Sequence, residues 1–159
     1  GFTSGPQRTI QRSEVELGSG PVAASVHVAV PMAISGARFF EDLLGEATRG
    51  LGISWKEQEI DAMGGLTLDE ALRQAQSALS RGIPVPFLLG NAQAKPLRFV
   101  LMLQGSTSGA TRAYQLYEPS SQELVWANEK TILSKGELPF DNKTLRRFLR
   151  VALPGPRGL

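Results

Sequence analysis

Short apolar runs separated by turn residues fill the second half of the chain, a pattern typical of β-strands. The runs are 83–89, 97–104, 112–117 and 124–127, and clusters of Gly, Ser, Asn and Pro lie between them. Because the connections are short, we expect neighbouring strands to pair as an antiparallel meander. The run 97–104 is apolar almost throughout and is predicted to be central. Pro84 and Pro86 confine the first run to a strand start or a sheet edge.

A helical pattern precedes these strands. Residues 67–80 carry an apolar stripe at helical spacing, and the sequence from Thr67 to Glu70 is the T-x-x-E pattern of a helix start. Gly82 is placed to end this helix. An earlier stretch, 35–49, has a similar stripe and predicts a second helix.

Small and β-branched residues alternate between Val22 and Val30 and predict a strand that Pro31 ends. Ser35 then stands where an N-cap of the helix 35–49 is expected. The remaining expectations are an exposed strand within 1–18, a polar connection with Trp55, a helical turn at 129–135, a brief helix at 143–147 capped by Asp141, and a strand at 148–153. The fold class is therefore α+β, with an N-terminal strand and two helices before the meander.

Length and composition limit the alternatives. The chain has 159 residues, of which 42% are hydrophobic and 20% charged, which suits one globular domain over 1–153 with a flexible tail at 154–159. A formal charge of +2 argues against a nucleic-acid partner. No run approaches the roughly 18 apolar residues of a membrane span, so we expect no membrane partner. The compartment stays open, with a fragment of a larger or secreted protein as one interpretation.

The chain has no cysteine and one histidine, His27. This excludes disulfides, thiolate metal sites and a thiol nucleophile, and we expect neither a metal nor another cofactor. An enzymatic interpretation would combine Ser35, at the positive end of a helix, with His27 and Glu118. The alternative roles are an N-cap for Ser35, a hydrogen-bonded structural imidazole for His27 and a strand-end charge for Glu118.

Aromatic and basic side chains are interleaved along the predicted meander. Tyr114 and Arg112 occur on one strand of it, without the spacing of an RNA-binding motif. The residues that we predict to bind a partner are Arg98, Phe99, Tyr117, Glu118 and Trp126. Core packing is the alternative role of the aromatic members.

The segment 67–130 resembles the C-terminal half of papain-like domains of the bacteriocin-processing, double-glycine leader peptidase type. Ile83-Pro84-Val85 is similar to the family's G-x-P-V strand, and Glu118-Pro119 to its acidic turn. Arg98 or Phe99 stands where the family has its catalytic histidine. The catalytic cysteine is absent, and the nearest analogues are Ser35 and Ser19.

The resemblance implies a papain-like fold without the catalytic pair. We therefore predict a non-catalytic domain that holds a partner polypeptide in a groove between its helices and its meander. Two alternatives remain. One is a hydrolase or transferase domain of a secreted effector or larger polyprotein, with a site centred on Ser35. The other is an assembly domain that pairs through an edge strand, either the one predicted from Pro84 or the N-terminal one.

Overall fold

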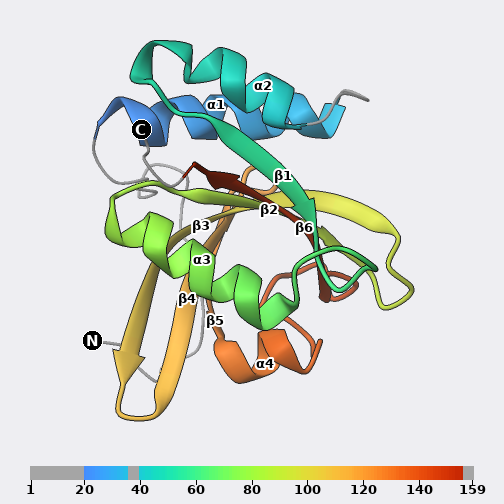
Figure 1. The fold of residues 1–159 in the computed structure, drawn as a ribbon. Helices are drawn as coiled ribbons and strands as arrows, with labels where there is room; N and C mark the ends of the chain where they lie inside the picture. Colours follow the sequence, from blue (N-terminus) through green and yellow to red (C-terminus); the bar gives the residue numbers. More distant parts are fainter. Residues whose placement is uncertain (1–19, 36–39, 156–159) are drawn as a thin grey trace.

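A computed structural model describes residues 20–35 and 40–155 (Figure 1). The elements in chain order are α1 (Pro21–Ser35), α2 (Phe40–Ala47), the 3-10 helix η2 (Arg49–Leu51), β1 (Trp55–Glu59), α3 (Leu68–Ser80), β2 (Val85–Gly90), β3 (Pro96–Ser108), β4 (Thr111–Glu118), β5 (Glu123–Asn128), α4 (Glu129–Leu133) and β6 (Arg147–Pro154). The strand predicted within 1–18 lies outside the described residues. None of the described helices is long and apolar enough to cross a bilayer.

The six strands form one antiparallel sheet in the order β1-β6-β2-β3-β4-β5. Consecutive strands β2 to β5 lie side by side, so the predicted meander is confirmed. The last strand returns beside β2, and β1 pairs with it at the edge. Helices together with an antiparallel sheet confirm the α+β class. The predicted last strand is confirmed too, and its pairing continues through Pro154.

Helix α3 begins and ends where the sequence predicts. The Thr67 hydroxyl accepts a hydrogen bond from the backbone N–H of Glu70 at 3.1 Å, as an N-cap does. The Glu70 carboxylate does not complete a capping box but accepts hydrogen bonds from Arg73 and Gln74. Gly82 follows the helix with φ +78°. Its left-handed conformation is the reason that glycine is favoured there.

The strand predicted for Val22–Val30 is wrong, because these residues belong to α1. The buried side chains are Ala23, Val26, Ala29 and Val30, which follow helical and not alternating spacing. Small apolar residues occupy almost every position here, so both periods fit the sequence. Pro31 lies within the helix, where its missing N–H costs a hydrogen bond to the His27 carbonyl.

The N-cap predicted at Ser35 is wrong as well. Ser35 is the last residue of α1, at the end where helix carbonyls and not N–H groups are exposed. The predicted second helix exists in part, as α2 from Phe40 to Ala47. After η2, Gly52 reverses the chain with φ +72°. Trp55, expected in a connection, opens β1.

Of the two places predicted for Pro84 and Pro86, the structure shows the strand start and not the sheet edge. Pro84 precedes β2 and Pro86 is its second residue, while β2 lies between β6 and β3. Pairing of β2 with β6 begins only at Phe87, whereas Pro86 pairs with Leu101 of β3 alone. The missing N–H of Pro86 therefore removes no hydrogen bond between β2 and β6. The helix predicted at 143–147 is a turn, in which Asn142, and not Asp141, accepts the backbone N–H of Thr144.

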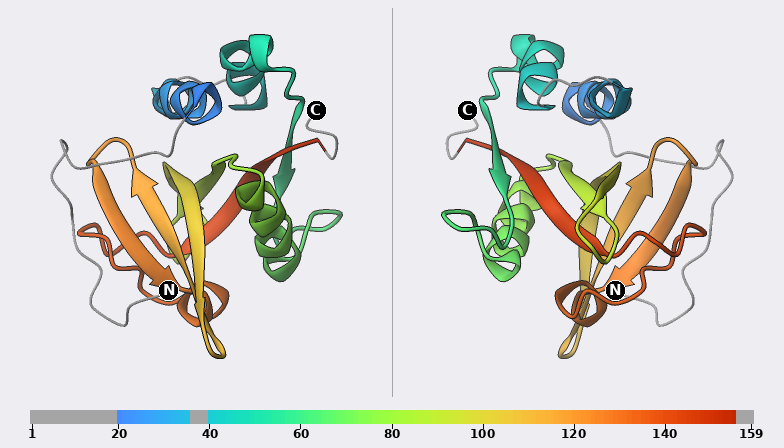
Figure 2. Two further views of the ribbon diagram at one scale, coloured as in Figure 1. Left: turned by 90° about the vertical axis from the view of Figure 1, so that its left-hand side faces the viewer. Right: turned by 90° about the vertical axis from the view of Figure 1, so that its right-hand side faces the viewer.

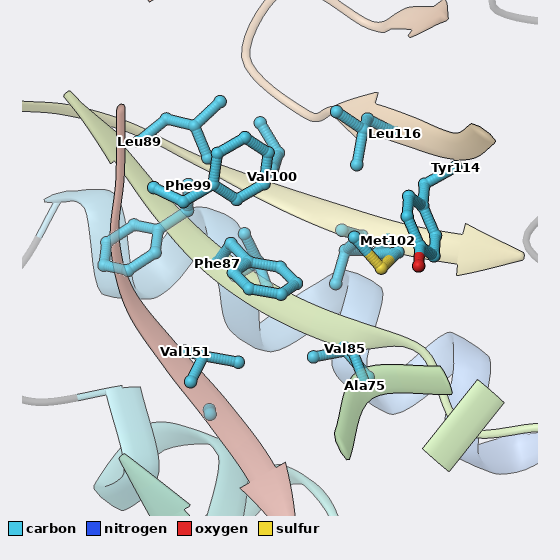
Figure 3. Packing of buried hydrophobic residues seen from close by; sticks show 14 of the residues in the cluster. Ala75, Val85, Phe87, Leu89, Phe99, Val100, Met102, Tyr114, Leu116 and Val151 are labelled. Atoms are coloured by element: carbon cyan, nitrogen blue, oxygen red, sulfur yellow. The ribbon is translucent and has the colours of Figure 1, made fainter. Parts of the chain in front are cut away.

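Helices cover the sheet from opposite sides. Side chains alternate between faces along β4, and Tyr114 bonds to α3 while Tyr117 contacts α1. We call these faces the α3 side and the α1 side. On the α3 side, Ala75 packs among sheet residues such as Phe87 and Met102 (Figure 3). The pair α1–α2 lies at the opposite end of the molecule from α4 and the tip of the β3–β4 hairpin (Figures 1 and 2).

Candidate functional site

A cleft separates the C-terminal half of α3 from the β3–β4 hairpin on the α3 side of the sheet. It has a volume of about 310 Å³. The helix contributes Gln76, Leu79 and Ser80, and the hairpin contributes Gln104, Gly105, Ser106, Thr107, Arg112 and Tyr114. This volume is at the low end of the range of roughly 300–1,000 Å³ for ligand pockets. The cleft therefore has room for a small group or a short segment.

Tyr114 forms the floor of this cleft and links three elements. Its side chain is fully buried and lies beside Met102 in the hydrophobic cluster (Figure 3). The hydroxyl accepts a hydrogen bond from Gln76 Nε2 of α3 at 2.5 Å and donates one to Glu129 Oε2 of α4 at 2.9 Å. Burial, followed by the hydrogen bond to Glu129, raises the pKa of Tyr114 well above its ordinary value. The phenol is therefore neutral at physiological pH and acts as a fixed hydrogen-bonding group.

Arg112 supplies the charge at the rim of the cleft. Its side chain is 39% exposed, and its guanidinium lies 3.9 Å from the Glu129 carboxylate. A contact at this length in water contributes little, and the guanidinium has five donors. Arg112 can therefore bind a carboxylate that enters from solvent.

Gly105 makes room for a ligand. It pairs with Tyr114 across the hairpin, so both residues face the cleft on the same side of the sheet. A Cβ placed at Gly105 would lie 3.4 Å from the Tyr114 ring, which is van der Waals contact without a clash. Any side chain longer than this would project into the cleft.

The structure does not bring His27 and Glu118 together. The His27 ring lies 5.5 Å from the ring of Tyr117, on the α1 side. Glu118 is the next residue of β4, so its side chain leaves the opposite side of the sheet. Ser35 ends α1, and its side chain lies outside the described part of the structure.

Glu118 holds a turn, and His27 is partly buried against the sheet. The buried Glu118 carboxylate accepts the backbone N–H groups of Ser120 at 2.9 Å and Ser121 at 3.1 Å, and also the Ser120 hydroxyl. It therefore stabilises the turn between β4 and β5. The Nδ1 atom of His27 is buried without a hydrogen-bond partner among the described residues. Burial lowers the pKa of His27, which favours the neutral ring.

The residues predicted to bind a partner do not line the cleft. Phe99, Tyr117 and Trp126 share the α1 side by strand alternation and register, and Phe99 and Tyr117 are buried. Arg98 lies on the other side, where its guanidinium donates to the Leu97 carbonyl at 2.9 Å.

Among the described residues, no three His, Cys, Asp or Glu side chains gather as metal ligands would.

The contribution of Gln76 to the cleft could not be predicted from the sequence. This residue lies 38 positions before Tyr114, and nothing local in the sequence pairs them. The signal that existed was Arg112 and Tyr114 close together on one predicted strand.

No protein-family model matches the chain, and comparisons with curated proteins and with solved structures likewise find no match.

Proposed function

We propose that this chain is a non-catalytic binding domain that holds a segment of a partner polypeptide in the cleft between α3 and the β3–β4 hairpin. The observation that carries the proposal is the cleft itself, where Gln76 and Arg112 present polar groups beside the buried Tyr114. Such a mixture of fixed polar groups and apolar surface suits a peptide backbone with its side chains. The cleft lies between a helix and the meander, where the sequence predicts a groove.

The chemistry of the lining favours binding over catalysis. Nucleophilic catalysis requires a nucleophile within reach of a base, and the cleft is lined by Ser80, Ser106 and Thr107 without a histidine or carboxylate. The phenol of Tyr114 is a poor base, because it is neutral and its hydroxyl already makes two hydrogen bonds. A hydrolase that combines Ser35 with His27 and Glu118 would need these side chains together, but His27 of α1 contacts Tyr117 on the α1 side, whereas the Glu118 side chain leaves the other side of β4.

The papain-like relationship remains part of this proposal. The order helix, strand, strand, strand, strand over 68–128 is compatible with the resemblance. Leu101 pairs with Tyr117, so the position of Phe99 lies on the strand beside the Glu118-Pro119 turn. In the papain-like family, the catalytic histidine and the residue that orients it would have to occupy two neighbouring positions of this kind.

Selection of peptides on the immobilised protein tests the proposal. A library of random twelve-residue peptides is selected on the wild type, and the peptides obtained are measured on Gly105→Leu, which fills the cleft. We expect the dissociation constant to rise at least about tenfold, because the leucine side chain occupies the space of the ligand. Gly50→Leu is the matched control, since Gly50 is exposed with no atom within 4 Å of a Cβ. Equal binding to wild type and Gly105→Leu would contradict the proposal.

A further inference from the structure

Strand β3 is longer than its neighbour β2 and leaves part of one edge open. Pairing with β2 spans Pro96 to Met102, whereas β3 continues to Ser108 and pairs with β4 on its other side. Among the described residues, no backbone hydrogen bond reaches the outer edge of 104–107. The same residues form one wall of the cleft. The cleft therefore contains a strand edge with which no described residue pairs.

The hairpin register shows which backbone groups face this edge. A two-residue turn, 109–110, joins the strands, so Ser108 and Thr111 exchange two hydrogen bonds. Hydrogen-bonded pairs alternate with non-bonded pairs along antiparallel strands, which makes Ser106 bonded to β4 as well. Gly105 and Thr107 consequently direct their N–H and C=O groups away from β4 and toward the open edge. These groups can bond to an added strand.

Charge indicates what kind of strand fits. Among the described residues that line the cleft, Arg112 is the only charged one. It lines the cleft and pairs with Thr107 across the hairpin, so it lies on the strand next to the one with the open edge. The guanidinium has five donors, so its contacts with Glu129 and Tyr114 leave others available. A carboxylate on the ligand would complement this charge.

We infer that the cleft binds an extended, acidic segment of a partner polypeptide, which pairs as an added strand with Gly105 and Thr107 and directs an acidic side chain to Arg112. The inference rests on the proposed function and specifies its ligand. In strand addition, main-chain hydrogen bonds supply affinity and side-chain contacts supply specificity. Gly105 permits the close approach that a backbone needs, because it places no side chain in the cleft.

Nine-residue peptides that alternate threonine and valine serve as probes, with glutamate, glutamine or lysine at the central position. Their binding is measured by fluorescence anisotropy. We expect the glutamate peptide to bind most tightly to the wild type. Thr107→Pro removes one outward N–H and should weaken binding about tenfold, while the β4 ladder stays intact. Thr107→Val keeps that N–H and the side-chain shape, and it should weaken binding much less than Thr107→Pro does. Arg112→Gln should abolish the preference for glutamate over glutamine.

A second measurement does not depend on whether the proline variant folds. Backbone N-methylation of the glutamate peptide, one residue at a time, should weaken binding at alternate residues only, because only every second N–H faces β3.

Each contrary result overturns the inference. No binding of the glutamate peptide up to about 1 mM would do so, since strand addition with a charge contact should exceed that affinity. Uniform effects of N-methylation, or equal binding to Thr107→Pro and Thr107→Val, would show that the peptide does not pair with β3. The proposed function would still stand if Gly105→Leu abolished the binding of selected peptides. Dimers of this chain that Thr107→Pro prevents would assign the edge to a second copy and not to a partner.

Discussion

Replacing Tyr114 with phenylalanine tests whether the floor of the cleft is held by its hydroxyl. The hydroxyl joins α3 to α4 through Gln76 at 2.5 Å and Glu129 at 2.9 Å. A neutral hydrogen bond contributes about 1 kcal/mol net, and one to a charged group about 1.5–3 kcal/mol. The Glu129 side chain is 25% exposed, so water can replace part of the lost bond. We therefore expect the free energy of unfolding to fall by about 2 kcal/mol.

Urea unfolding followed by circular dichroism measures this loss. With a slope of about 2 kcal/mol per molar urea, the midpoint should fall by about 1 M. A double-mutant cycle with Gln76→Ala isolates one bond, and we expect a coupling of about 1 kcal/mol between the two changes. A loss below about 0.5 kcal/mol for Tyr114→Phe, with no coupling, would refute the reasoning. In that case the hydroxyl would not hold the hairpin against the helices.

Three further predictions concern the supporting structure. Burial lowers the pKa of His27 in the folded protein below its unfolded value of 6.5. The folded protein is therefore fully stable above pH 6.5 and loses stability as the pH falls below this value, because the unfolded state binds the proton more readily. The urea midpoints at pH 7.5 and 5.5 should consequently differ less in His27→Gln than in wild type. Thr48→Val should cost about 1–3 kcal/mol in urea unfolding, because it leaves the buried Trp55 Nε1, now 2.8 Å from the Thr48 hydroxyl, without an acceptor. Thr67→Ala should cost about 1 kcal/mol by removing the N-cap of α3, whereas Thr67→Ser should cost far less; equal losses would contradict the cap.

Local signals predicted the parts of the fold that they determine. Thr67 and Gly82 define the ends of α3, because capping depends on residues within one turn. The meander follows from short apolar runs and short turns. The strand predicted for residues 22–30 was wrong because alternating small side chains suit both a strand and a buried helix. The contacts with α2 and β3 decide in favour of the helix.

The position of β2 and the composition of the cleft depend on long-range contacts. Prolines usually exclude an interior strand, but β6 approaches β2 only after Pro86. The cleft lies between α3 and a hairpin some thirty residues later in the chain. No sequence pattern around Gln76 predicts its hydrogen bond to Tyr114. Arg112 and Tyr114 could be noticed in advance as a basic and an aromatic residue on one strand. Which residues of β3 share their side could not be predicted, because the bulge between Met102 and Gln104 shifts the register of β3 against β4.

Amide hydrogen exchange of the β3–β4 hairpin, followed by nuclear magnetic resonance, tests the central claim most directly. In the free protein the N–H groups of Gly105 and Thr107 should exchange rapidly, while that of Ser106, bonded to β4, should be protected. Saturation with the glutamate peptide should protect Gly105 and Thr107. Protection of these two amides already in the free protein, or rapid exchange that persists at saturation, would contradict a cleft that receives a polypeptide strand.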